Sequence, residues 1–306
     1  MIPAEYQKYE KTVTIAGVNW KGEWGNKGAN LEKMKTKVRE ASSFGINMIA
    51  FPELALTGYE CSEEAKKDHK PCSMHSEGAE TVPGPSTEDM AGLAKELNMY
   101  VLFGMPERDA KDPQKKYIST AIVGPEGVLG SYRKMHLATP PVWTEYYCFK
   151  PGNDLPVFET RYGPIGIQIC ADFWMYPELS RLLLLKGARI IFNTVGSAIS
   201  PGKIDLMVNE TTSRGQSTQC YIVSCNHIGT ERTISYYGNT TIGGPGFPKF
   251  QRTLVRSESI EEIVWATVSF ETLARSRQIF LVKEAGNWDL IAREYRKVAD
   301  SMGQNR

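Results

Sequence analysis

Apolar residues recur along the chain with two different periods, which predicts short strands alternating with helices. Residues 12–20 (TVTIAGVNW) alternate in polarity and are rich in β-branched side chains, as in a strand. The next apolar residues recur at steps of three and four and predict a helix: Leu31, Met34, Val38 and Ala41. Asn30 is the predicted N-cap of this helix and Gly45 its predicted end.

The same order of β-rich runs and helical patterns continues through most of the chain. Further strands are predicted over residues 47–53, 99–107, 117–124, 127–134, 188–193 and 220–229, and two more lie within 155–170 around a turn at 162–164. A hairpin turn is predicted at 124–127, a polar loop over 60–84, helices after Pro177 and over 203–219, and a mainly helical tail from 269. This mixture predicts an α/β or α+β layered fold with a mixed sheet. Residues 1–306 are expected to form a single domain, with a core of about 12–270 and a helical extension of about 271–306.

Composition narrows the classes of protein to which the chain could belong. Lys and Arg number 36 against 35 Asp and Glu, and no block of like charge stands out, so we expect neither a nucleic-acid partner nor a membrane surface. The chain has no apolar run of the roughly 20 residues that would span a bilayer, and its N-terminal residues do not resemble a secretory signal. Six cysteines without a regular framework predict reduced thiols and a cytoplasmic location.

Three apolar runs end in residues that could carry out chemistry. Glu53 ends the run 47–53, Lys134 ends 127–134 and Cys170 ends 165–170. Ligand clefts in open α/β folds form at the rim of the sheet, where such strand ends lie. A carboxylate, an ammonium and a thiol together could support covalent acyl transfer. From the residues alone, a surface carboxylate and a buried structural cysteine remain open alternatives.

The segments around these residues resemble the three motifs of the nitrilase, or carbon–nitrogen hydrolase, superfamily. They are FPELALTGY at 51–59, YRKMHL at 132–137 and GIQICADFWMYPE at 166–178, with Glu53, Lys134 and Cys170 separated by 81 and 36 residues as in that family. The resemblance extends over about residues 12–270. It implies a four-layer α-β-β-α sandwich whose subunits pair through helices, so that a homodimer or larger homo-oligomer is expected.

The resemblance also implies a role for each matched residue. Glu53 would be the general base, Lys134 the cation that stabilises the tetrahedral intermediate, and Cys170 the nucleophile. Glu145 matches the second glutamate of amidase members, and the backbone N–H of Ala171 would join Lys134 in the oxyanion hole.

The activity implied by the resemblance is hydrolysis of a small linear amide to a carboxylic acid and ammonia through a cysteine thioester, with no metal or organic cofactor. The stretch DFWM after the nucleophile lacks the arginines of amino-acid carbamoylases, although Arg232 could replace them, and Asp172 stands where nitrilases usually have Glu. The alternatives that remain are an N-carbamoyl amine amidohydrolase, a nitrilase, and a catalytically silent binding protein of the same fold.

Two further groups of residues bear on the expected cleft. Tyr59, Trp143 and Trp174 are candidates for walls of the substrate pocket. The 60–84 loop also holds four residues of zinc-ligand type: Cys61, His69, Cys72 and His75. Their intervals do not match the usual paired spacings of zinc sites, so a flexible loop beside the cleft is favoured, and a metal site stays open as the alternative.

Overall fold

The computed structural model describes residues 7–139, 144–246, 250 and 252–303, and two six-stranded sheets form its centre. The first sheet has the order β14-β1-β2-β3-β4-β5. Its strands are β1 (Thr12–Val18), β2 (Met48–Ala50), β3 (Tyr100–Arg108), β4 (Lys116–Gly124), β5 (Gly127–Arg133) and β14 (Ile263–Ser269). β1, β2 and β3 are parallel, whereas β14, β4 and β5 pair antiparallel with their neighbours. The predicted mixed sheet and the hairpin between β4 and β5 are confirmed.

The second sheet has the order β13-β12-β9-β8-β7-β6. Its strands are β6 (Val157–Phe158), β7 (Ile165–Ile169), β8 (Ile190–Val195), β9 (Tyr221–Asn226), β12 (Thr241–Gly244) and β13 (Arg252–Arg256). β7, β8 and β9 are parallel and buried along their whole length, which explains their continuous apolar runs. A separate hairpin is formed by β10 (Ile228–Glu231) and β11 (Ile234–Tyr237).

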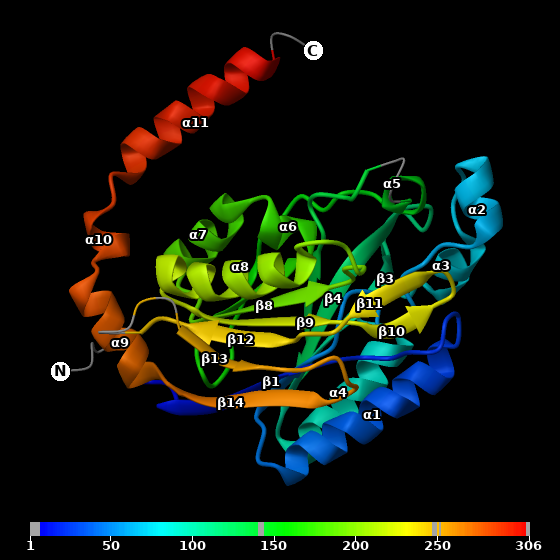
Figure 1. The fold of residues 1–306 in the computed structure, drawn as a ribbon, viewed down its shortest axis with the longest axis horizontal. Coiled ribbons are helices and arrows are strands. Elements are labelled where there is room, and N and C mark those ends of the chain that lie inside the picture. Colours follow the sequence, from blue (N-terminus) through cyan, green and yellow to red (C-terminus); the bar gives the residue numbers. More distant parts are fainter. Residues whose placement is uncertain (1–6, 140–143, 247–249, 251, 304–306) are drawn as a thin grey trace.

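The two sheets pack face to face, and helices cover both outer faces (Figure 1). β1 contacts β9 and β4 contacts β7 across the interior. α1 (Lys27–Ser43) and α4 (Pro85–Leu97) cover the first sheet, and α7 (Pro177–Leu185) and α8 (Lys203–Thr218) cover the second. The chain therefore has the predicted four-layer α-β-β-α sandwich, and the parallel strands of both sheets lie in its interior.

Two local predictions need correction. The N-cap of α1 is Asn26, whose side chain accepts a hydrogen bond from the N–H of Ala29. Asn30 lies inside the helix and donates to the carbonyl oxygens of Glu23 and Leu56, because it faces the buried loop that precedes the helix. The 60–84 region is also not a plain loop, because it contains α2 (Glu63–Asp68) and α3 (Ser73–Gly78).

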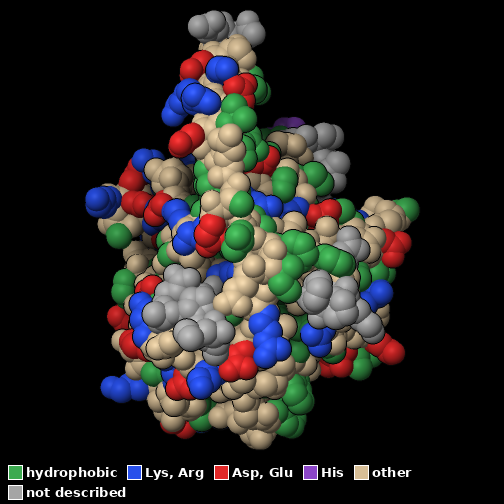
Figure 2. Space-filling view, turned by 90° about the vertical axis from the view of Figure 1, so that its left-hand side faces the viewer, with side chains coloured by type: hydrophobic (Ala, Val, Ile, Leu, Met, Phe, Trp, Pro, Cys, Tyr) green, Lys and Arg blue, Asp and Glu red, His purple; other side chains and the backbone are tan. Residues whose placement is uncertain are grey.

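The C-terminal part of the chain is helical, as predicted. α9 (Phe270–Ile279), α10 (Val282–Ala285) and α11 (Trp288–Gly303) follow the last strand. α11 runs away from the body of the molecule and carries charged and apolar side chains (Figures 1 and 2). Within the described residues, none of the helices combines the length and the apolar character needed to cross a bilayer.

Candidate active site

Glu53 stands just beyond the end of β2, and its carboxylate is completely buried between the two sheets. One oxygen, Oε1, accepts a hydrogen bond from Lys134 Nζ at 2.7 Å, and Oε2 accepts one from the N–H of Gly196 at 2.9 Å. His227 Nε2 lies 2.6 Å from the backbone carbonyl of the same glutamate. Side chain and backbone are thus both held in one orientation.

Gly196, which follows β8, must be a glycine for this arrangement. A Cβ added there would lie 2.8 Å from the ring of Tyr59 and 3.0 Å from Glu53 Oε2. Since both distances are shorter than ordinary contacts, any side chain would displace the carboxylate or the tyrosine. The second sheet thus contributes a close backbone approach to a carboxylate that belongs to the first.

Lys134 directly follows β5 and bridges two carboxylates. Its fully buried ammonium donates to Glu53 at 2.7 Å and to Glu145 Oε1 at 2.8 Å. Glu145 begins the short helix α5 (Glu145–Cys148) and is also held by the Tyr59 hydroxyl at 2.5 Å and by the N–H of Ala138 at 2.9 Å. The result is a buried carboxylate–ammonium–carboxylate row in which each charge has a partner.

Burial and the neighbouring charges set the protonation of this row. Burial raises the pKa of Glu53 to about 7, although Lys134 opposes the rise. Burial on its own would lower the pKa of Lys134, but Glu145 and Glu53 more than offset this effect and hold the pKa well above its usual value. The site therefore contains a permanent cation beside a carboxyl group that can gain and lose a proton near neutral pH.

Cys170 lies on a sharp turn between β7 and the helix α6 (Ala171–Trp174), in a backbone conformation that is rare for residues with a side chain. Its φ is 49° and its ψ is −103°. Its N–H bonds to the carbonyl oxygen of Thr194 and to the side-chain oxygen of Asn193, both at 3.1 Å. A strand, a strained residue and a helix in this order form the elbow on which many nucleophiles are carried.

The Cys170 thiol interacts with the buried charged row. Burial and the charge of Glu53 raise its pKa to about 12, although Lys134 opposes the rise. The thiol is therefore neutral at pH 7 and needs a base before it can act as a nucleophile. Cys170 is also only half-buried, in contrast to Glu53 and Lys134. Cys170 is thus the least enclosed of these three residues.

The structure brings together most of the residues predicted for the pocket. Ala171 is the first residue of α6, so its N–H belongs to the helix start, where N–H groups lack intrahelical acceptors. Trp174 ends the same helix, and its indole lowers the pKa of Cys170. Tyr59 contacts Glu145, as described above, and Trp143 lies outside the described residues.

Arg232, predicted as a possible substitute for a substrate-binding arginine, is engaged elsewhere. Its guanidinium lies 4.3 Å from the centre of the Trp24 ring and 3.8 Å from a carboxylate oxygen of Glu63. The next residue of the chain on its N-terminal side, Glu231, accepts hydrogen bonds from the N–H groups of Tyr59 and Glu60. This segment therefore braces the loop after Glu53.

Two residues near the nucleophile were not predicted from the sequence. The buried carboxylate of Asp172 accepts hydrogen bonds from the Tyr132 hydroxyl at 2.7 Å and from the N–H groups of Met135 and His136 at 3.1 and 2.9 Å. It thereby fastens the segment around Lys134 to the nucleophile helix. The sequence offers one indication of this role, the position of Asp172 two residues after the cysteine. From the sequence alone, that position served only to argue against a nitrile substrate.

Tyr236 is the other unpredicted residue. Its hydroxyl is buried without a hydrogen-bond partner in the described part of the chain. Burial raises the pKa of this hydroxyl, and the charges of Glu231, Glu60, Glu53 and Cys170 raise it further. It lies on β11, far from Cys170 in the sequence, and no motif marks it.

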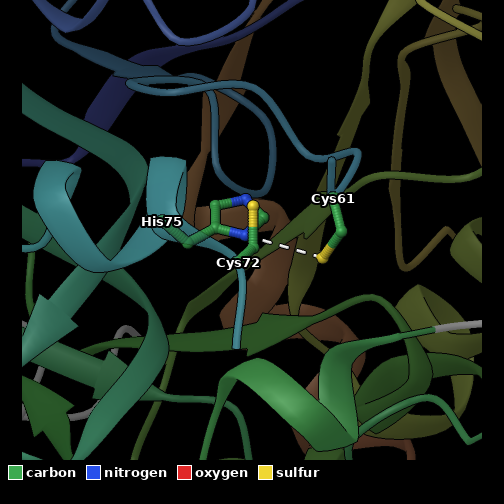
Figure 3. A group of neighbouring side chains, drawn as sticks. All are labelled: Cys61, Cys72 and His75. Atoms are coloured by element: carbon green, nitrogen blue, oxygen red, sulfur yellow. Dashed lines mark hydrogen bonds between the residues drawn. The ribbon is translucent and has the colours of Figure 1, made fainter. Parts of the chain in front are cut away.

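A second group of reactive side chains lies next to this site. The buried residues Cys61, Cys72 and His75 converge, with one ligand-type atom of each within 4.8 Å of the others (Figure 3). The Cys148 sulfur lies 3.2 Å from that of Cys61. His69, the other candidate of the 60–84 loop, is not part of the group and stacks on the ring of Tyr147. The flexible loop predicted here is thus a folded element with a buried sulfur-rich centre.

Comparison with known proteins agrees with this geometry. Residues 12–278 match the family model of the carbon-nitrogen hydrolases. A probable nitrilase of Schizosaccharomyces pombe is 33% identical over 220 residues, which cover 71% of this chain and 75% of that protein. Omega-amidase NIT2 of Bos taurus is 28% identical over 286 residues, which cover 88% of this chain and 94% of the relative. The crystal structure of Saccharomyces cerevisiae Nit3, a member of branch 10 of the nitrilase superfamily, matches with a TM-score of 0.76 at 23% identity, over 91% of this chain and 98% of that one.

The family match spans most of the chain, and the S. pombe relative is aligned over more than two thirds of both sequences. The chain therefore belongs to the carbon–nitrogen hydrolase family of the nitrilase superfamily and is a hydrolase of carbon–nitrogen bonds other than peptide bonds.

Proposed function

We propose that the protein hydrolyses a small linear amide to a carboxylic acid and ammonia through a thioester on Cys170. One observation carries this proposal: a half-buried thiol on a strained elbow lies beside a carboxyl group with a pKa of about 7 and a buried ammonium. These are the groups needed to create a nucleophile, to stabilise an oxyanion and to protonate a leaving group.

In the first half of the proposed cycle, Glu53 takes the thiol proton as the sulfur forms a bond to the amide carbon. The resulting oxyanion is stabilised by Lys134 and by the N–H of Ala171. The protonated Glu53 then gives its proton to the amide nitrogen, the C–N bond breaks, and ammonia leaves. The thioester with Cys170 remains.

In the second half, a water molecule attacks the thioester carbon while Glu53 accepts its proton. The new tetrahedral intermediate collapses, the C–S bond breaks, and the sulfur regains a proton from Glu53. The carboxylic acid is released, so that one amide and one water yield one acid and one ammonia. Glu145 keeps the Lys134 ammonium in place throughout, and the Tyr59 hydroxyl holds Glu145. Without this second carboxylate, Glu53 would be the only acidic partner that orients the ammonium.

One buried polar group near Cys170 favours an uncharged polar substrate. The Tyr236 hydroxyl is without a hydrogen-bond partner among the described residues. A buried polar group without a hydrogen-bond partner destabilises the folded protein, and a bound amide could offset this cost by accepting or donating a hydrogen bond. An amide, unlike a carboxylate, would do so without bringing a further negative charge to Glu53 and Glu145.

The test measures ammonia release from a panel of short-chain amides, N-carbamoyl amines and nitriles by the purified full chain. Turnover of amides, with a thioester adduct on Cys170 seen by intact-protein mass spectrometry, is the expected result. The Cys170→Ala variant should lose at least about 10³-fold in kcat/KM, the scale seen when a nucleophile is removed, while Cys225→Ala, a buried cysteine on β9, should keep its activity. Preference for N-carbamoyl amines or nitriles, or binding without turnover, would replace the proposal by the corresponding alternative.

Location and assembly are part of the same proposal. All six cysteines are free, and a reducing cytoplasm would keep them so. A homodimer is favoured by α11, which buries none of its residues and exposes Leu290, Val298 and Met302. A second copy could cover these side chains. Light scattering after gel filtration tests the assembly. The wild type should have the mass of two chains and the Val298→Glu variant that of one, whereas a wild-type mass of one chain contradicts the proposed homodimer.

A further inference from the structure

Four buried side chains between the 60–84 region and α5 have the composition of a zinc site. They are three thiols and one imidazole, from Cys61, Cys72, Cys148 and His75. Cys72 and His75 lie at the start of α3 with two residues between them, Cys61 precedes α2, and Cys148 ends α5. Thiolate and imidazole are the ligands that Zn²⁺ prefers in closed structural sites, where four such groups surround the ion.

The distances agree with a shared tetrahedral centre. Zinc–ligand bonds of about 2.3 Å to sulfur and about 2.0 Å to nitrogen place two sulfurs about 3.8 Å apart and a sulfur and a nitrogen about 3.5 Å apart. The Cys61 sulfur lies 3.2 Å from that of Cys148 and 3.8 Å from His75 Nδ1. Cys148 also interacts with the His75 ring. The ligand atoms of Cys61, Cys72 and His75 lie within 4.8 Å of one another, and Cys148 adjoins them through its contacts with Cys61 and His75.

The surroundings also orient the ligands. His75 Nε2 lies 3.2 Å from the carbonyl oxygen of Gly58, so that Nε2 carries the proton and Nδ1 presents its lone pair to the sulfurs. The N–H of Ser62 donates to the Cys72 sulfur, and the N–H of Cys72 donates to the Cys148 sulfur, each at 3.4 Å. N–H groups that point at sulfurs stabilise thiolates, which are the form that binds metal.

We propose that Cys61, Cys72, His75 and Cys148 bind one structural Zn²⁺, with His75 coordinating through Nδ1. Figure 3 shows three of these residues, Cys61, Cys72 and His75. The ion replaces the thiol protons and ties α5 to the segment that contains α2 and α3. All four coordination positions are filled by protein, so the ion has no open position for a substrate and takes no part in the chemistry at Cys170.

The proposed ion would position the active site. Cys148 is on the same short helix as Glu145, and Cys61 is two residues from Tyr59. Glu145 and Tyr59 are hydrogen-bonded to each other, and Glu145 also holds Lys134. A four-residue helix has little stability of its own. A metal bound at its end would fix the helix and thereby hold Glu145 against the ammonium.

The test begins with metal analysis of the full chain, purified under reducing conditions from medium that contains zinc. We expect about one zinc per chain, and less than about 0.1 after Cys72→Ala or His75→Gln, because a structural zinc site depends on its full ligand set. Cys225→Ala and His69→Gln are the matched controls and should retain the metal, since neither residue belongs to the cluster. The Cys170→Ala variant should also retain it.

A second measurement does not depend on whether the variants fold. Wild-type protein stripped of metal and titrated with Co²⁺ should develop the sulfur-to-cobalt charge-transfer absorption and the intense visible bands of a tetrahedral thiolate site, and added Zn²⁺ should abolish them. The proposal is overturned if the wild-type chain holds no zinc and no such spectrum appears. It is equally overturned if peptide mapping finds a Cys61–Cys148 disulfide in protein kept under reducing conditions. Because these readouts do not use activity, they are independent of the proposed amidase reaction.

Discussion

The molecule contains two sulfur sites that differ in what surrounds the sulfur. At Cys170 a single half-buried thiol lies beside a carboxyl group and an ammonium, on a strained turn. In the cluster, Cys61 and Cys148 are buried and face each other and an imidazole. The same side chain thus meets a base and a cation at one site and further ligands at the other. Its neighbours decide whether a thiol is suited to attack a substrate or to bind a metal.

The two sites share structural elements although they differ in chemistry. α5 begins with Glu145, which belongs to the charged row, and ends with Cys148, which belongs to the cluster. Damage to the cluster is therefore expected to reach the charged row, whereas damage to the reactive groups should leave the cluster intact. Substitutions in the charged row should therefore lower the activity without lowering the metal content.

Replacement of Glu53 by Gln should lower kcat/KM about 10²- to 10⁴-fold, because the amide cannot accept the proton of Cys170. The side chain keeps its size and its contact with Gly196, so thermal unfolding should still show a single cooperative transition. Ammonia release and metal content are measured on the same sample. Loss of zinc together with activity would mean that the two sites are not separable in this direction.

Lowering the pH should inhibit the enzyme as Glu53 becomes protonated. Its pKa of about 7 predicts that kcat/KM falls about tenfold per pH unit below 7, and thus about 100-fold by pH 5, because only the ionised form is a base. A profile that stays flat between pH 5 and 7 contradicts this assignment, provided that circular dichroism shows folded protein throughout.

Protonation of Glu53 should have the opposite effect on the free energy of unfolding, which it raises. A carboxyl whose pKa is raised on folding, here from 4.5 to about 7, stabilises the folded state fully below pH 4.5. This contribution is lost as the pH rises through 7. Relative to Glu53→Gln, the wild type should therefore lose free energy of unfolding between pH 5 and 8, as measured by urea titration.

The Tyr59→Phe substitution should have a smaller effect, about 10- to 100-fold in kcat/KM. It removes the hydroxyl that donates to Glu145 at 2.5 Å, and a hydrogen bond to a charged group contributes about 1.5–3 kcal/mol. Tyr221→Phe is a suitable control, because its hydroxyl donates to the carbonyl oxygen of Ser269, at the end of β14. Equal losses in both variants would argue against a specific role for Tyr59.

Cys225→Ala should have the smallest effect. The residue is fully buried on β9 and lies outside both sites, so its loss should cost about 1 kcal/mol of unfolding free energy through the small cavity that remains. Activity and zinc content should match those of the wild type. A change in the activity or in the zinc content would mean that Cys225 contributes to one of the two sulfur sites.

Much of the fold could be predicted from local patterns in the sequence. The helix containing Met34 and Val38 and the parallel strands β7 and β8 follow directly from periodic or continuous apolar residues. The position of Asn30 could not be predicted in the same way, because a cap and a buried asparagine have the same local sequence signal. Two short helices in the polar 60–84 region lacked a long enough apolar pattern to be recognised.

Glu53, Lys134 and Cys170 could be singled out from the sequence because each follows an apolar run, and ligand clefts in open α/β folds form at strand ends. Asp172 and Tyr236 could not, since their role depends on contacts with segments that are distant in sequence. Cys148 is the strongest case: its partner Cys61 is 87 residues away, and no spacing rule joins the two.

The sequence by itself thus determined the layered architecture and the three strand-end groups, because periodicity and strand ends are properties of neighbouring residues. Only the tertiary structure decided which groups meet: that Lys134 lies between two carboxylates, and that the loop thiols meet a thiol from α5 rather than His69. The reason is physical. Burial and the distances between charges and ligands arise from packing between remote segments, and a linear pattern does not encode them in any local interval.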